Sequence, residues 1–162
     1  MRRLIAVLAA ALAAGCAGYS PSDVKPGQTA EEVARSMGPP TARYSLPDGR
    51  QRIEYARGPM GKHTYMIDLD AQGRVTGWEQ VLTERNFESV APGMTREQVL
   101  LKLGRPAEHL LIPRQGFDIW NYRYDASPLC RWYQVSMRGD AVAEAGYGND
   151  PMCDAGDRAD RE

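Results

Sequence analysis

The sequence predicts an α+β fold made of two tandem repeats, each a short N-terminal helix followed by a three- to four-stranded antiparallel β meander. Two observations support this prediction. Residues 24–40 and 90–106 align without a gap and share 8 of 17 positions, which is typical of a duplicated unit. In both copies a helical pattern is followed by short alternating segments between turn residues, the order expected of a helix and then β hairpins.

The helix of each copy is predicted from its ends and its apolar stripe. Thr29 and Thr95 are N-cap candidates, with Glu or Gln three residues later as in a capping box. Apolar side chains in helices 29–37 and 95–103 recur every three or four residues, so that each helix has one apolar face. A glycine, followed two residues later by a proline, ends both helices.

The strands are predicted by alternation between turn signals. In the first copy they are expected at 51–57, 64–70 and 74–82, and in the second copy at 117–125, 130–137 and 141–147. A short helix near 83–88 is expected to join the copies, with Thr83 as its cap and Phe87 packed beneath it.

The first fifteen residues have the pattern of an export signal. Arg2 and Arg3 precede the apolar run 4–14, which is too short to cross a bilayer. The run ends in LAAGC, which resembles the lipobox of bacterial lipoproteins. This resemblance implies a lipid on Cys16. Ala17, not Asp, follows the cysteine, and the resemblance to enteric lipoproteins then implies a location at the outer membrane, facing the periplasm. The alternative is an ordinary signal peptide followed by a chance cysteine.

These observations predict the organisation of the whole chain. The predicted segments are a lipoprotein signal peptide at 1–15, a lipidated tether at 16–23, repeat one at 24–82, a linker with a short helix at 83–89, repeat two at 90–149 and a polar tail at 150–162. Cys130 and Cys153 remain in the exported part and are expected to form a disulfide, because that compartment is oxidising. The alternative is two free thiols.

The repeat pattern V-x-P-G-x-T-x-E-x-V, followed by G-x-P and a β meander behind a lipobox, resembles the SmpA/OmlA (BamE-like) family of outer-membrane lipoproteins. The resemblance covers nearly all of residues 24–147, as two copies. It implies a protein-binding accessory factor in outer-membrane protein assembly or envelope integrity, with the β-barrel assembly machinery as its partner. The tandem pair is also similar in architecture to secreted β-lactamase inhibitor proteins. That second likeness implies, as the alternative, an inhibitor-type module that binds a periplasmic or secreted enzyme.

Composition and motifs favour binding over catalysis. Twenty Lys and Arg against 21 Asp and Glu give a net charge of −1, which does not favour a nucleic-acid binder. No nucleophile motif stands out, so we expect neither an enzyme nor a cofactor. Residues 68–79 nearly match a calcium-binding loop, but their strand-like flanks favour a β hairpin. His63 and His109 lack partners at ligand spacing, so no metal site is expected.

Aromatic residues supply the prediction of a partner-binding surface. Trp120 is expected in the core, because the matching position of the first copy is also apolar. Period-2 alternation places Tyr133 inside and therefore Trp132 outside, with Met66 as its counterpart in the first copy. Exposed aromatic residues are frequent binding hot spots, so Trp132 and Met66 are predicted to contact the partner.

Overall fold

The computed structural model describes residues 20–152 of the 162-residue chain. Its first unit comprises α1 (Ala30–Met37), β1 (Ala42–Ser45), β2 (Gln51–Ala56), β3 (Thr64–Leu69) and β4 (Val75–Gln80), with 3-10 turns at Pro21–Asp23 and Pro47–Gly49. Its second unit comprises α2 (Glu84–Glu88), α3 (Arg96–Leu103), β5 (Glu108–Ile112), β6 (Phe117–Arg123), β7 (Arg131–Arg138) and β8 (Ala141–Asn149).

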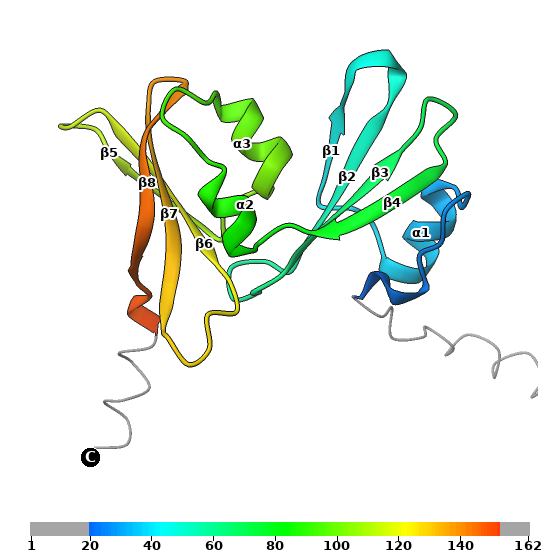
Figure 1. Cartoon of the computed structure of the whole chain (residues 1–162), viewed down its shortest axis with the longest axis horizontal. Coiled ribbons are helices and arrows are strands. Elements are labelled where there is room, and N and C mark those ends of the chain that lie inside the picture. The colour runs from blue at the N-terminus through cyan, green and yellow to red at the C-terminus, as the bar shows by residue number, and fades with distance from the viewer. Residues whose placement is uncertain (1–19, 153–162) are drawn as a thin grey trace, which may run out of the picture.

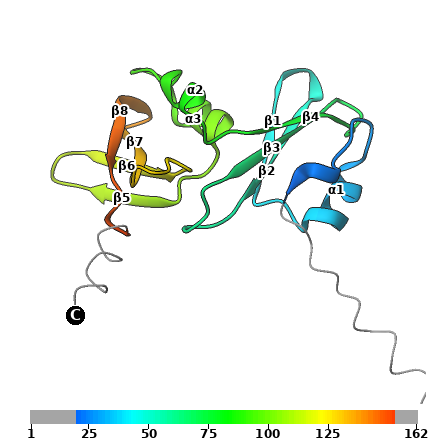
Figure 2. The ribbon, with the colours of Figure 1, turned by 60° about the horizontal axis from the view of Figure 1, so that its bottom comes forward.

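The elements form four layers (Figure 1): α1, the sheet β1–β4, the helices α2 and α3, and the sheet β5–β8. Figure 2 shows the same order of layers from a second direction. Both sheets are antiparallel meanders of four strands. The α+β prediction of two units, each with a short helix and a meander, is therefore confirmed.

The predicted helix ends are also confirmed. Thr29 Oγ1 accepts a hydrogen bond from Glu32 N at 3.2 Å, and a Glu32 carboxylate oxygen accepts one from Thr29 N at 2.7 Å. Thr95 and Gln98 form the same pair of bonds in α3. These capping boxes satisfy backbone donors that the first helical turn leaves unpaired.

The first strand of each sheet, β1 or β5, was not located by alternation. β1 has only four residues, which is too few for a clear pattern. β5 reads EHLLI, with consecutive apolar residues instead of an alternation. Pairing with β2 and β6 defines these two strands, and that information is not local to either segment.

Two apolar cores hold the layers together. The first lies between α1 and the sheet β1–β4 and includes Val33, Ile53 and Ile67. The second spans both units, because Met66 of β3 packs in one cluster with Tyr122 of β6 and with side chains of α2 and α3. The first sheet therefore has helices on both faces. Within residues 20–152, no helix covers the outer face of the sheet β5–β8 (Figure 1).

The prediction that Trp132 and Met66 are exposed is wrong, because their exposed fractions are 7% and 0%. The alternation itself is right: Trp132 points away from Tyr133 and lies on the face of its β6 partner, Arg123. The Arg123 guanidinium covers the Trp132 ring at 5.2 Å from its centroid. Met66 is covered because the chain leaving α3 at Gly104 packs on that face of the first sheet.

Residues 68–79 form the β3–β4 hairpin, which confirms the hairpin interpretation. The Asp68 carboxylate accepts hydrogen bonds from the Arg52 guanidinium at 2.6 and 2.9 Å. Asp70 Oδ1 accepts from the backbone nitrogens of Gln72 and Arg74, both at 2.9 Å. These carboxylates are thus occupied by donors of the chain itself. Among the described residues, no group of three or more His, Cys, Asp or Glu is placed to hold a metal ion.

No helix in residues 20–152 has both the length and the apolar character needed to cross a membrane.

Candidate functional site

The four edge strands of the two sheets differ in what covers them. The edge of β4 is partly covered by the segment before α1, since Gly27 N donates to Val75 O and Val75 N to Gln28 O, each at 2.8 Å. The segment before α3 covers the start of β8 in the same way, through Gly93 and Met94. β1 and β5 each pair with one neighbour only.

β5 is the apolar one of these edges. Leu110 and Leu111 are 51% and 61% exposed, and as adjacent strand residues they point to opposite faces of the sheet. Leu110 lies opposite Ile119, and Ile112 lies opposite Phe117, both on the outer face that no described helix covers. We call this group, Leu110, Leu111, Ile112, Phe117 and Ile119, the β5 edge surface.

A free strand edge can pair with another chain. Its outward N–H and C=O groups form a row that accepts a further strand, and side chains on alternate positions add apolar contacts. β1 is a poorer candidate, because it has four residues and none of the large apolar side chains that are exposed in the described chain. The chemistry available at β5 is therefore recognition of an extended, partly apolar segment.

A charged cluster holds β5 and β6 against α3. Asp118 of β6 accepts a hydrogen bond from Arg96 Nη1 at 2.6 Å and contacts Nε2 of His109, which lies on β5. Arg96 also lies over the Trp120 ring, 5.0 Å from its centroid. Burial alone would raise the pKa of Asp118, but the hydrogen bonds and charges of Arg96 and His109 outweigh it, and the pKa is lowered. The edge is thus positioned before any partner binds.

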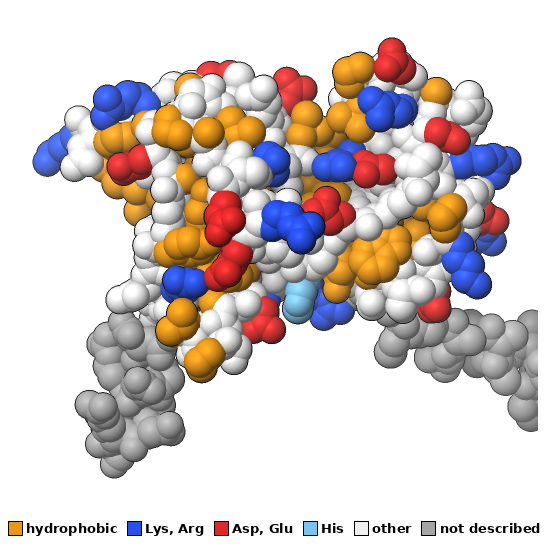
Figure 3. Space-filling model, viewed as in Figure 1, with side chains coloured by type: hydrophobic (Ala, Val, Ile, Leu, Met, Phe, Trp, Pro, Cys, Tyr) orange, Lys and Arg blue, Asp and Glu red, His pale blue; other side chains and the backbone are white. Residues whose placement is uncertain are grey.

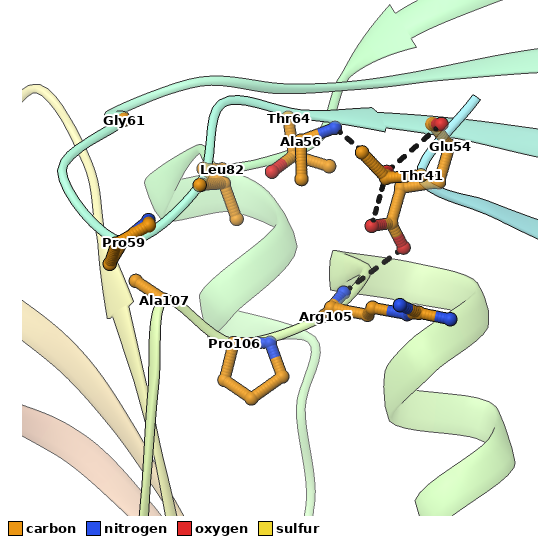
Figure 4. Close-up of a pocket in the computed structure, with 11 residues that line it drawn as sticks. Thr41, Glu54, Ala56, Pro59, Gly61, Thr64, Leu82, Arg105, Pro106 and Ala107 are labelled. Atoms are coloured by element: carbon orange, nitrogen blue, oxygen red, sulfur yellow. Dashed lines mark hydrogen bonds between the residues drawn. The ribbon is translucent and has the colours of Figure 1, made fainter. Parts of the chain in front are cut away.

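A second candidate is a cavity of about 230 Å³ where the two units meet. The β2–β3 loop and residues 105–107 line it, and Figure 4 shows the Glu54 carboxylate at its wall. Glu54 Oε1 accepts a hydrogen bond from Thr41 Oγ1 at 2.9 Å, and Oε2 accepts from Tyr44 Oη at 2.5 Å and from Arg105 N at 3.1 Å. Burial, together with the Glu54 carboxylate, raises the pKa of Tyr44.

The partners of Glu54 assign this cavity a structural role. Thr41 and Tyr44 belong to the first unit and Arg105 to the second, so the carboxylate fastens the units to each other. Arg52 of β2 adds a second link by donating to Leu101 O at 2.9 Å. A buried carboxylate with three donors is a satisfied group, and we do not assign a ligand to it.

The residues predicted as sites do not come together in one place. Cys16 and Cys153 lie outside the described residues, so the lipid attachment and the Cys130–Cys153 pairing stay predictions. Cys130, just before β7, is disulfide-bonded. Trp132 and Met66 are buried on different sheets and form no common surface. The β5 edge surface was missed because the run LLI before Pro113 does not alternate.

Comparison with known proteins leaves the family open. No protein-family model matches the chain, and no curated protein matches it either. Among solved structures, the chain is similar to a candidate β-lactamase inhibitor protein from Streptococcus mutans, with 10% sequence identity over 80% of this chain and 87% of that chain and a TM-score of 0.32. A likeness at this level carries no conclusion about function. Membership of the SmpA/OmlA family therefore stays a prediction.

Proposed function

We propose that this chain is a lipid-anchored protein of the bacterial envelope that binds a partner protein through the β5 edge surface. The observation that carries the proposal is the free edge of β5 with Leu110 and Leu111 both more than half exposed. The lipobox-like sequence ending at Cys16 supports the export and the anchor.

In this proposal β5 accepts an extended strand of the partner as a fifth strand of the sheet. Backbone hydrogen bonds would provide affinity, and Leu110 would select an apolar side chain on the outer face. Strands of outer-membrane barrels alternate apolar and polar residues, so that the apolar face of such a strand matches Leu110 on the outer face of the sheet. An unfolded barrel strand, or a strand of the machinery that inserts it, therefore fits the edge.

A second candidate function is an inhibitor-type module that binds a folded enzyme. The observation that favours it is the outer face of the sheet β5–β8, which no helix covers within residues 20–152. Phe117 is half-buried on that face, with the Arg138 guanidinium 4.5 Å from its ring centroid. Cationic and aromatic side chains of this kind are frequent in protein interfaces. Here the sheet face would make the contact and the strand edge would remain unpaired.

The two functions are tested by crosslinking from position 111 in living cells. A photoreactive amino acid replaces Leu111 at the edge or, as a control, Leu129, which is 57% exposed in the loop between β6 and β7. We expect position 111 to capture a barrel-assembly component or a nascent barrel protein that position 129 does not capture. Capture of one soluble enzyme by the same photoreactive amino acid at position 117, on the outer face, and not at position 111 would instead support the inhibitor-type function.

A binding assay measures how much Leu110 and Leu111 contribute to the affinity for an extended peptide. The double variant Leu110→Ser/Leu111→Ser should weaken binding of a synthetic peptide with alternating apolar residues by about tenfold or more, since two exposed leucines lose apolar contact area. Leu129→Ser should leave the affinity unchanged. Equal affinities of wild type and double variant would exclude β5 as the binding edge.

A further inference from the structure

We propose that a second surface of this molecule rests on a lipid membrane. It is formed by loops 57–63 and 125–130 together with residues 150–152, and we call its exposed apolar side chains, Met60, Leu129 and Met152, the tip surface. The inference rests on the lipid anchor of the proposed function. It concerns a part of the molecule separate from β5.

The length of the tether limits how the body can sit at the membrane. From Cys16 to Ser20, the first described residue, the chain advances by four residues. An extended chain spans at most about 3.5 Å per residue, so that the Cα atom of Ser20 stays within about 14 Å of the Cα atom of the lipidated Cys16. The end of the molecule that carries Ser20 must therefore face the lipid.

The same end carries the tip surface. In Figure 1 the described chain begins at the lower side, where the β2–β3 loop, the β6–β7 loop and the segment after β8 also lie. In Figure 2 the β2–β3 loop, the segment after β8 and the start of the described chain below α1 all lie along the lower side. Three of the seven large hydrophobic side chains that are exposed in the described chain lie here, namely Met60 at 60%, Leu129 at 57% and Met152 at 49%. Exposed apolar residues at loop ends are typical of segments that enter a membrane interface.

One buried guanidinium ties the three segments of the tip surface together. Arg123 Nη1 donates to Pro59 O at 2.6 Å, and Nε and Nη2 donate to the Asp150 carboxylate at 2.7 and 3.2 Å. Asp150 N in turn donates to Cys130 O at 3.4 Å. Because the loops are fixed in the folded protein, they can meet a flat surface together without a further ordering cost.

The charge around Met60 suits anionic lipid. Loop 57–63 contains Arg57, Lys62 and His63 and no acidic residue. Asp150, one of the carboxylates of the tip segments, is paired with Arg123. Figure 3 shows a histidine with basic and acidic side chains along the lower edge of the molecule, and apolar side chains below the second sheet. Cations near a membrane surface are attracted to anionic headgroups.

The methionines allow a direct test. The chain from Cys16 onward, with methyl-labelled methionine, is coupled through Cys16 to a maleimide lipid in nanodiscs of phosphatidylcholine and phosphatidylglycerol. Mass spectrometry verifies a single adduct at Cys16. A nitroxide on the lipid acyl chain should then broaden the methyl signals of Met60 and Met152 strongly. Met66 and Met137, both fully buried, serve as internal controls. Equal broadening of all four signals, or of none, would overturn the proposal.

Variants separate this proposal from the function proposed for β5. On the Cys16→Ser chain, Met60→Ser/Leu129→Ser/Met152→Ser should reduce binding to phosphatidylglycerol vesicles by about fivefold or more, whereas Leu110→Ser/Leu111→Ser should not change it. An unchanged vesicle affinity of the triple variant would count against the tip surface. Whether Cys16 carries a lipid in cells is tested separately, by comparing palmitate labelling of the wild type with that of Cys16→Ser. Because the nanodisc coupling is chemical, the membrane contact is decided even if that labelling fails.

Discussion

Buried charged residues in this chain lie where elements meet. Glu54 joins the two units, Asp118 joins β6 to α3 and β5, and Arg123 joins the second sheet to a loop of the first unit. A charged group without a partner in the protein interior would strongly destabilise the folded state. These residues therefore hold neighbouring elements together, and substituting them should lower the free energy of unfolding.

Asp118→Asn should destabilise the protein in a pH-dependent way. In the wild type the pKa of Asp118 is lowered, which means that the folded state favours the ionised carboxylate. This carboxylate therefore stabilises the fold above pH 3.8, the usual pKa of an aspartate, and the stabilisation is lost as the pH falls below that value. We expect a loss of about 1–3 kcal/mol in the free energy of unfolding at neutral pH and a smaller loss at about pH 2.5.

Urea titration at both pH values measures these two losses. Asp140→Asn is the matched control, because Asp140 also lies near Arg96, at 3.8 Å, but is 79% exposed. The control should change stability little at either pH. A loss for Asp118→Asn that is the same at both pH values would contradict the assignment.

At the scale of elements, the two copies of the repeated helix end in the same way but in different surroundings. Both Gly38 and Gly104 have a positive φ, 83° and 76°. A Cβ atom on Gly38 would meet nothing within 4 Å, whereas on Gly104 it would lie 3.0 Å from Glu54 Oε2 and 3.1 Å from Met66 Cε. The difference arises because the end of α3 packs on the first sheet.

Gly104→Ala should therefore cost more stability than Gly38→Ala. Both variants place a side chain at a positive φ with ψ near 180°, a region essentially restricted to glycine, for a loss of about 1–3 kcal/mol each. Gly104→Ala should lose a further amount of about 1–2 kcal/mol, because its neighbours in the unit junction must shift. Denaturant titration of both variants measures the difference. Equal losses in the free energy of unfolding would show that the residues around Gly104 shift without destabilising the protein.

At the scale of the whole molecule, the two units share one core. Met66, Val81 and Leu82 precede the second repeat in sequence, yet they pack in one cluster with Trp120 and Tyr122 of β6. The second unit thus covers a face of the first sheet that would otherwise be apolar and open to water. Separating the units would expose this face together with Glu54.

We therefore expect a single unfolding transition for the whole chain. In calorimetry, the measured enthalpy should equal the van't Hoff enthalpy, and a fragment of residues 20–88 should not give a cooperative transition. Two separate transitions, or a stably folded fragment, would show that the shared core contributes little to stability.

Glu54→Ala removes the carboxylate that links the two units, and it should lower the transition temperature without splitting the transition.

Local signals were sufficient for most of the elements. The caps at Thr29 and Thr95 and the helix at 84–88 are where short-range patterns predicted them. So are the later strands of each sheet, because capping and alternation depend on residues close in sequence. The duplication also predicted two units of equal design.

What the sequence by itself determined is therefore the local structure and the face to which each strand residue points. The tertiary structure alone decided what covers each face. Trp132 was correctly placed on the face away from Tyr133, but it is buried because Arg123, held by Pro59 from 64 positions away, lies over it. The exposure of β5 likewise follows from the stacking order of the layers. Periodicity reports on neighbours along the chain, whereas burial depends on partners that only folding brings together.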